Sequence, residues 1–339
     1  MDHVSTTETI SYRSNGLLKR RLLERGQHMM VTERFGYVDP QQKNNTKTSN
    51  WRRYHSAPRA TAPLADGIPP EGTQMSYTDI SCTLEMYGAL FPITDQIQLT
   101  HEDPVLKETV NVAGEQIGET IEEIRINFMK AGTNVFYADN AAARTSVNSP
   151  PTRGDFRRIY RYFKSRKAKE MTSIISPSGK ISTEPVPPSY FVLGHTDLDS
   201  DIRSINGFIP YQNYSDPGQA MMGEIGSIEQ FRIILTAMFT PWLAGGASGV
   251  EFLSGGVPVT SAASADVYPL LFIAKNSYAI VPLQGFNSAE MYVKAPGDVN
   301  VANPLGQIGF VSWKTFQGGT ILNQDWIARL ECAATATPD

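Results

Sequence analysis

The sequence predicts an α+β fold, and three features of it carry that prediction. The first is one unusually long amphipathic helix over residues 103–131. The second is a set of strand-like stretches on both sides of this helix, over 75–100 before it and over 308–333 after it. The third is an extension over 56–73 that lacks a helical period. Helices and strands that occupy separate runs are typical of the α+β class.

The long helix is predicted by its apolar period. Apolar residues recur every three or four positions, at Leu106, Val110, Ala113, Ile117, Ile121, Ile124 and Phe128. Asp103 fits the N-cap, Pro104 the first helical position and Gly132 the end. Such a helix is roughly 40 Å long, whereas the usual helix has about 11–12 residues.

The opposite face of this helix is acidic, with Glu108, Glu115, Glu119, Glu122 and Glu123. Gly114 and Gly118 lie one turn apart and would let another backbone approach closely. The stripe by itself fits an ordinary core helix of any large domain equally well. The stretches before and after the helix must therefore show whether it has a more specific role.

Before the helix, the chain reads as strands around an extension. Trp51–Tyr54 is a strand candidate, and Ile97–Leu99 is another. Ser56–Thr73 between them contains four prolines, namely Pro58, Pro63, Pro69 and Pro70. A structureless stretch of this length is usually functional.

After the helix, a second helix is predicted over Asp155–Met171. It buries Phe156, Ile159, Tyr160 and Phe163, and its other face holds Arg157, Arg158, Arg161, Lys164, Arg166, Lys167 and Lys169. Contact with phosphate and simple solvation of this basic face both remain open. Ser189–Gly194 reads as a buried strand and Asp197–Ile205 as a short helix, and closing strands are expected over Ile308–Phe316 and Trp326–Ala333.

Composition excludes several classes of protein. The chain has 339 residues, 41% hydrophobic and 19% charged, which is typical of a globular protein. No run approaches eighteen apolar residues, and the N-terminus has no apolar signal-peptide core, so neither a membrane span nor secretion is predicted. Cys82 and Cys332 are too few for a disulfide framework, which favours synthesis in a reducing cytoplasm.

Charge is distributed unevenly. The net charge is −4, yet residues 1–60 hold eleven Lys/Arg against five acids and the rest of the chain is correspondingly acidic. The basic residues that we single out in this leading part are Lys19, Arg20, Arg21, Arg25, Arg52 and Arg53. A basic arm on an acidic body contacts an acidic partner or is a solvated tail, and the sequence leaves both open.

No constellation indicates catalysis. Nucleotide-binding glycine motifs are absent, and the five histidines are scattered. His195 with Asp197, Asp199 and Asp201 is the densest cluster, but it lacks the glycine and the distal glutamate of a calcium loop. We therefore predict a turn and helix cap there, with no enzymatic activity, cofactor or metal.

The order of these parts resembles the major capsid proteins of tailed bacteriophages, which have the Hong Kong 97-type fold, and most resembles the N-four-like phage major capsid family. The resemblance covers about residue 50 to the C-terminus. Its motifs are Trp51–Tyr54, Ala62–Gly67, Pro70–Gly72, Tyr87–Gly88, Asp95, Leu106, Gly132–Asn134, Tyr137, His195–Asp197, Asp201–Arg203, Gly207–Phe208, Gly223–Gly226 and Arg232.

This resemblance implies five parts. They are an N-terminal arm over 1–50, an extended loop over 51–80, a peripheral domain over 81–187 with the spine helix, an axial domain over 188–300, and a return to the peripheral domain over 301–339. A proline-rich two-stranded loop cannot bury itself on its own body, so it is expected to lie on a neighbouring subunit.

The resemblance also implies a function and partners. The protein would form hexamers and pentamers of an icosahedral shell around double-stranded DNA, which it would contact non-specifically, in the virion capsid. A portal, a scaffold protein and a decoration protein are further expected partners. The alternative is a nucleic-acid-binding or tail-associated structural phage protein. Because residues 1–45 show no heptads, we expect the arm to be kept and any scaffold to be a separate protein.

Overall fold

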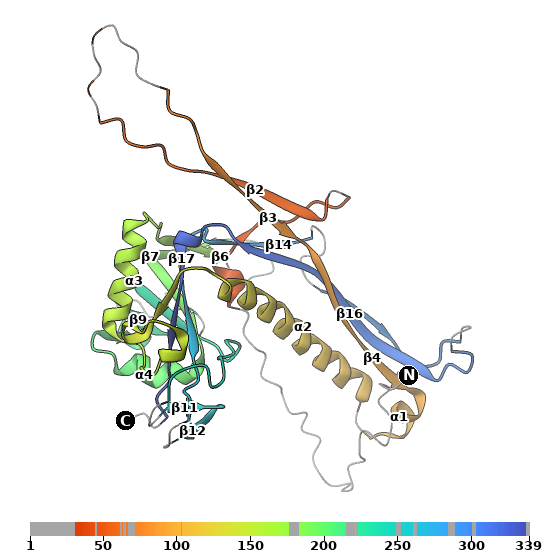
Figure 1. Ribbon diagram of the computed structural model, residues 1–339. Helices are drawn as coiled ribbons and strands as arrows, with labels where there is room; N and C mark the ends of the chain where they lie inside the picture. Colours follow the sequence, from red (N-terminus) through yellow and green to blue (C-terminus); the bar gives the residue numbers. More distant parts are fainter. Residues whose placement is uncertain are drawn as a thin grey trace.

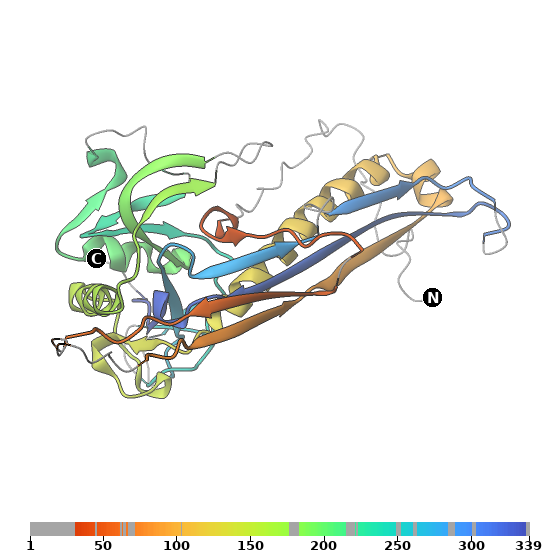
Figure 2. The same cartoon turned by 90° about the horizontal axis from the view of Figure 1, so that it is seen from above.

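Two β-sheets and one long helix organise the protein. The computed structural model describes residues 31–44, 46–61, 63, 66, 72–102, 104–175, 183–214, 221, 223–248, 252–259, 263–283, 289–299 and 303–336. An eight-stranded sheet with helices packed on it forms the broad part of the molecule (Figure 1). A narrow five-stranded sheet extends from this part, and the long helix runs beside it (Figure 2).

The five-stranded sheet, called the long sheet below, is built on two long strands. Its order is β1-β14-β16-β15, and β4 also pairs with β16. The strands are β1 (Tyr37–Val38), β4 (Glu85–Thr94), β14 (Tyr278–Pro282), β15 (Glu290–Lys294) and β16 (Ile308–Ile321). β4 and β16 are antiparallel, from Thr94 opposite Ile308 to Glu85 opposite Gln317. The predicted closing strand is therefore confirmed and is longer than expected.

The long helix α2 (Val105–Lys130) covers one face of this sheet. Trp313 of β16 is buried against its apolar stripe and donates a hydrogen bond from Nε1 to Gln116 Oε1 at 2.9 Å. The helix begins one residue later than predicted, with Pro104 as the N-cap residue, whereas Asp103 lies outside the described residues. Of the predicted stripe, Ala113 and Ile121 are fully buried and the other residues are half-buried.

One residue that was predicted for the acidic, outward face of α2 is buried instead. Glu122 is only 1% exposed, because residues 31–35 cover it. This stretch was predicted as part of a polar arm over 1–50, but Val31 and Phe35 fill the space between α2 and the second sheet. Within it, η1 (Thr32–Arg34) is a short 3₁₀ turn. Residues 31–35 therefore pack on the body of the molecule.

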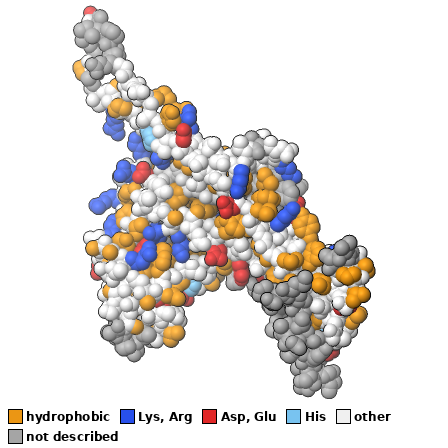
Figure 3. All heavy atoms as spheres, turned by 45° about the vertical axis from the view of Figure 1, so that its right-hand side comes forward, with side chains coloured by type: hydrophobic (Ala, Val, Ile, Leu, Met, Phe, Trp, Pro, Cys, Tyr) orange, Lys and Arg blue, Asp and Glu red, His pale blue; other side chains and the backbone are white. Residues whose placement is uncertain are grey.

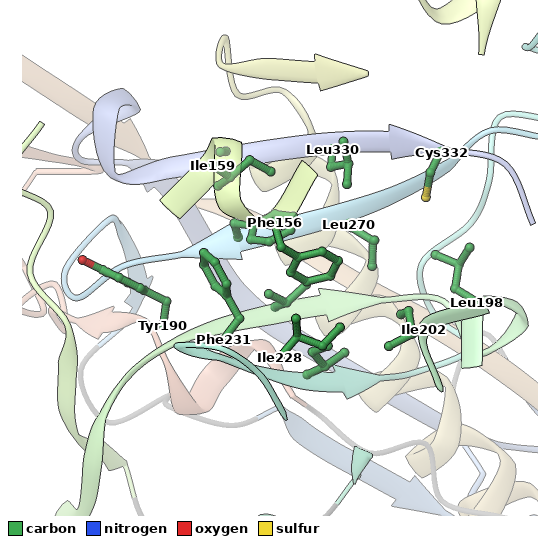
Figure 4. Close-up of a cluster of buried hydrophobic side chains, with 14 of the residues drawn as sticks. Phe156, Ile159, Tyr190, Leu198, Ile202, Ile228, Phe231, Leu270, Leu330 and Cys332 are labelled. Atoms are coloured by element: carbon green, nitrogen blue, oxygen red, sulfur yellow. The ribbon is translucent and has the colours of Figure 1, made fainter. Parts of the chain in front are cut away.

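The eight-stranded sheet has the order β5-β17-β13-β7-β10-β9-β8, with β6 pairing to β7. Its strands are β5 (Val135–Tyr137), β6 (Met171–Ile175), β7 (Thr183–Gly194), β8 (Phe208–Pro210), β9 (Glu224–Ile228), β10 (Phe231–Leu235), β13 (Tyr268–Ile273) and β17 (Ile327–Cys332). Helices α3 (Arg153–Ser165) and α4 (Asp199–Ser204) supply apolar residues to a core on this sheet. Phe156 and Phe231 lie at its centre (Figure 4). A smaller hairpin pairs β11 (Phe252–Ser254) with β12 (Val257–Val259).

Two predicted elements differ from the structure. The helix predicted to reach Met171 ends at Ser165. Lys167 adopts a φ of +54°, and Ala168 N–H bonds the Phe163 carbonyl at 2.9 Å, which together close the helix in a Schellman motif without glycine. Ile97–Leu99, predicted as a strand, lies in helix α1 (Asp95–Thr100), because the Thr94 hydroxyl caps the Ile97 N–H.

Candidate assembly interface

The predicted extended loop is a two-stranded ribbon that projects from the body (Figure 1). β2 (Thr48–Tyr54) and β3 (Tyr77–Thr83) are antiparallel, with Tyr54 opposite Tyr77. Most of their residues are exposed or half-buried, so the ribbon has little core of its own. An isolated two-stranded hairpin is marginal in water, and cross-strand pairs must hold this one together.

The outer part of the ribbon is held by charge and aromatic contacts. Arg52 lies opposite Asp79 and donates two hydrogen bonds to its carboxylate, at 2.7 and 3.1 Å. The Arg52 guanidinium also lies 4.2 Å from the Tyr77 ring centroid. The hydrogen bond from Arg52 lowers the pKa of Asp79. Both charges are exposed, so this pair sets the strand register more than it adds stability.

The base of the ribbon is attached to the long sheet. Cys82 and Leu84 are buried with Val281 of β14, and Trp51 packs against them. Trp51 Nε1 donates to Asp39 Oδ2 at 2.9 Å, and Arg53 donates to the Asn323 side chain. The ribbon therefore leaves the body at a fixed point, in the direction that Figure 1 shows.

The predicted site residues fall into three groups. Arg52 and Arg53 lie on the ribbon, each with a partner in its own chain. Pro58 and Pro63 are exposed in the segment between the two strands. The remaining predicted positions lie outside the described residues, namely Lys19, Arg20, Arg21, Arg25, Pro69 and Pro70.

The outer face of the long sheet is an exposed apolar surface that the sequence analysis missed. On the face turned away from α2, Leu90 lies opposite Ser312, which in turn lies opposite Tyr292. Leu90 is 62% exposed and Tyr292 46% exposed, and Met86 further along β4 is 66% exposed. The sequence contained a signal for this surface, because β4 has large apolar residues on both of its faces.

A second exposed apolar group lies at the far end of the long sheet, where α1 meets the β15–β16 connection. Leu99 of α1 is 82% exposed, and Val299 and Leu305 are 69% and 75% exposed. The Asp95 N–H donates to the Gln307 carbonyl at 2.8 Å, which brings these two segments together. Exposed hydrophobic side chains gather at this end in Figure 3. Contiguous exposed apolar surface is typical of protein–protein contacts.

The basic face of α3 is only partly neutralised. Arg153 and Arg157 share Glu229, at 3.1 and 2.6 Å, and Lys164 pairs with Glu170 at 2.6 Å. Burial alone would raise the pKa of Glu229, but the two arginines outweigh it and hold that pKa below its ordinary value.

In the predicted turn near His195, the imidazole caps the short helical turn, and the neighbouring carboxylates bind other partners. The Asp197 N–H donates to His195 Nδ1 at 3.0 Å, and Tyr268 donates to the Asp197 carboxylate at 2.8 Å. Asp201 accepts the Thr335 N–H. Across the described ranges, no group of three or more His, Cys, Asp or Glu side chains is placed to hold a metal ion. None of the helices in the described part of the chain is both long and apolar enough to span a membrane.

Comparison with known proteins extends this picture. The family described as phage capsid protein matches residues 77–326. A major capsid protein of Pseudomonas phage KPP21 is 26% identical over 181 residues, which are 50% of this chain and 45% of that protein. The chain therefore aligns with less than half of that relative's length.

Solved capsid structures align with nearly the whole chain. The capsid of Ralstonia phage GP4 matches with a TM-score of 0.64 at 9% identity, covering 98% of this chain and 99% of that one. The capsid of cyanophage Pam1 matches with a TM-score of 0.61 at 11% identity, covering 97% and 100%. At such identities the likeness concerns the fold, and it confirms the predicted α+β fold of the Hong Kong 97 type.

Proposed function

The chain belongs to the phage capsid protein family, and we propose that it is the major capsid protein of a tailed phage. Copies of it assemble as hexamers and pentamers into an icosahedral shell that encloses double-stranded DNA. The observation that carries this proposal is the match of the family over 77–326. The match contains α2, β4 and β16 of the long sheet, the strands of the eight-stranded sheet except β17, and the second strand of the ribbon. The function is structural, without a catalytic step.

The β2–β3 ribbon is proposed to lie on an adjacent subunit of the same capsomer. Its exposed Tyr54, Met75 and Tyr77 find no core in their own chain among the described residues. A contact in which the ribbon of one copy lies on a different surface of the next copy is heterologous, and such contacts close into rings. In this proposal, Arg52 holds the two strands of the ribbon together, and Arg53 fixes the point at which the ribbon leaves the body.

The division into domains is proposed to follow the two sheets. The axial domain then comprises the eight-stranded sheet with α3 and α4, so that 135–175 and β17 join 188–273. The peripheral domain comprises the long sheet with α1 and α2, and it takes in β14 and β15. This division moves the boundaries expected at residues 188 and 300, because strands distant in sequence pair within one sheet.

Contacts between capsomers are proposed to use the exposed apolar groups of the peripheral domain. Leu99 and Leu305 are strongly exposed, and α1, which carries Leu99, lies at the end of the long sheet away from the eight-stranded sheet (Figure 1). A portal, a separate scaffold protein and a decoration protein are proposed as further partners from family membership alone. Packaged DNA would be met through phosphate contacts without sequence specificity.

Expression of the chain followed by electron microscopy tests the function, and deletion of 58–74 tests the ribbon. The full chain, supplied with its phage's scaffold protein, is expected to give closed shells, and particles of any other kind would contradict the capsid assignment. The deletion removes the segment between β2 and β3 but leaves both strands. It is expected to give soluble subunits without closed shells. Normal shells from the deletion would refute the ribbon's role and leave the capsid assignment standing.

A further inference from the structure

The point at which the N-terminal arm meets the body is fixed by α2. The Val31 and Thr32 N–H groups both donate to Glu122 Oε1 at 3.1 Å, and the Thr32 hydroxyl donates to Oε2 at 2.6 Å. The Glu122 carboxylate is buried by these contacts. The first described residue, Val31, is therefore held at the surface of α2.

The same face of α2 continues as a row of carboxylates toward the helix N-terminus. Glu119, Glu115 and Glu108 precede Glu122 by three, seven and fourteen positions, which on a helix of 3.6 residues per turn places all four on one side. This side is opposite the stripe that packs on the long sheet. Among the described residues, nothing lies within 4 Å of a Cβ built at Gly114 or Gly118, at the edge of the row.

The segment that enters this point has matching charge and length. Leu17–Met30 carries Lys19, Arg20, Arg21 and Arg25 against a single acid, Glu24. Its sequence predicts an amphipathic helix with Leu17, Leu18, Leu22 and Leu23 on one face. Fourteen helical residues span roughly 21 Å, and the distance from Glu108 to Glu122 along α2 is the same.

We propose that Leu17–Met30 docks along the acidic face of α2 in its own chain, parallel to it, from Glu122 toward Glu108. The junction at Val31 sets the alignment, so that residue n lies beside residue n + 91, which is the offset between Val31 and Glu122. Arg25 then lies near Glu115 and Glu119, and Arg20 and Arg21 lie near Glu108 and Glu115. These cations engage the protein itself and not packaged DNA. The contact lies within one subunit and does not depend on the proposed function.

A disulfide test locates the segment directly. With the offset of 91, Gln27 lies beside Gly118, and neither residue carries charge. The variant Gln27→Cys/Gly118→Cys, oxidised as assembled or soluble full-length protein, is expected to form a disulfide within one chain, seen as a faster monomer band on a non-reducing gel. The control pair Gln27→Cys/Ser312→Cys places the second cysteine on the opposite face of the long sheet, and it is expected to form none. A ladder of dimers and larger species, or no disulfide at all, would overturn docking within the chain.

A charge swap separates this contact from DNA binding. Changing Arg20, Arg21 and Arg25 to Glu is expected to raise hydrogen exchange in 17–30 about tenfold, because exposed ion pairs are individually weak. Adding Glu108→Lys, Glu115→Lys and Glu119→Lys is expected to restore protection. Exchange that the second set of changes does not lower would overturn the proposal. Genome retention that falls with the first set of changes and is not recovered with the second would also overturn the proposal, because DNA would then be the partner of these arginines.

Discussion

Replacing Glu122 by alanine is expected to detach residues 31–35 from α2. The carboxylate is 1% exposed and accepts three hydrogen bonds, two from backbone N–H groups and one from the Thr32 hydroxyl. A buried donor left without a partner costs about 1–3 kcal/mol. Two orphaned N–H groups and one lost hydroxyl contact therefore sum to about 3–5 kcal/mol after partial relaxation.

Amide hydrogen exchange measures this loss where it occurs. A loss of about 3 kcal/mol in the free energy of local opening raises exchange roughly a hundredfold in peptides covering 31–35. Glu123→Ala is the matched control, because Glu123 is exposed and one residue away, and it is expected to change stability by less than about 0.5 kcal/mol. A double-mutant cycle with Thr32→Val should show a coupling energy of about 1–2 kcal/mol. Equal exchange in Glu122→Ala and Glu123→Ala would refute the reasoning.

Three further changes test other parts of the structure. Ile121→Asp places a carboxylate in a position that is 4% exposed, and the subunit is expected to be insoluble, whereas a cooperative melt would show that this face is not core. Gly319→Ala brings a Cβ into the space of the Phe128 ring, so thermal unfolding should show destabilisation by about 1–3 kcal/mol, and an unchanged melting temperature would contradict that packing. Glu229→Gln is expected to lower stability at pH 7. Arg157 and Arg153 lower the pKa of Glu229 in the folded protein. The stability advantage of the wild type over the variant is therefore present above the carboxyl's unfolded pKa and is lost as the pH falls through the folded pKa. A difference in denaturant midpoint between wild type and variant that is equal at pH 7 and pH 3 would argue against this reasoning.

The long helix and the ribbon were predictable because their signals are local. An apolar residue every three or four positions specifies α2, and prolines with few bulky residues mark the extension between β2 and β3. The burial of Glu122 was not predictable, because the covering residues lie about ninety positions away in a segment that reads as polar. Helix α1 was missed although Thr94 and Asp95 form an ordinary N-terminal signal, since the apolar Ile97 favoured a strand.

The exposed outer face of the long sheet was unpredictable for a different reason. In β4, Leu90 points away from α2, whereas Phe91 next to it packs with the core on the α2 side. Large apolar residues on both faces of a strand are typical of burial on both sides. In an assembling protein the second layer belongs to another molecule, so one chain's sequence shows the burial pattern without showing what supplies it.

The two ends of α2 are held differently, and this difference determines where the subunit can bend. At its C-terminal end, Ile126 and Met129 share one cluster with Phe35, with β7 and β14, and with the start of β17, so the helix is packed there against both sheets. Among the described residues, its N-terminal half packs on the long sheet and on Ile97 of α1, and it contains Gly114 and Gly118, each of which weakens a helix by about 1 kcal/mol. We therefore expect any bending of α2 between copies in different shell environments to occur in this half. The acidic row lies there as well, so a docked arm would stiffen the part of the helix that the glycines weaken.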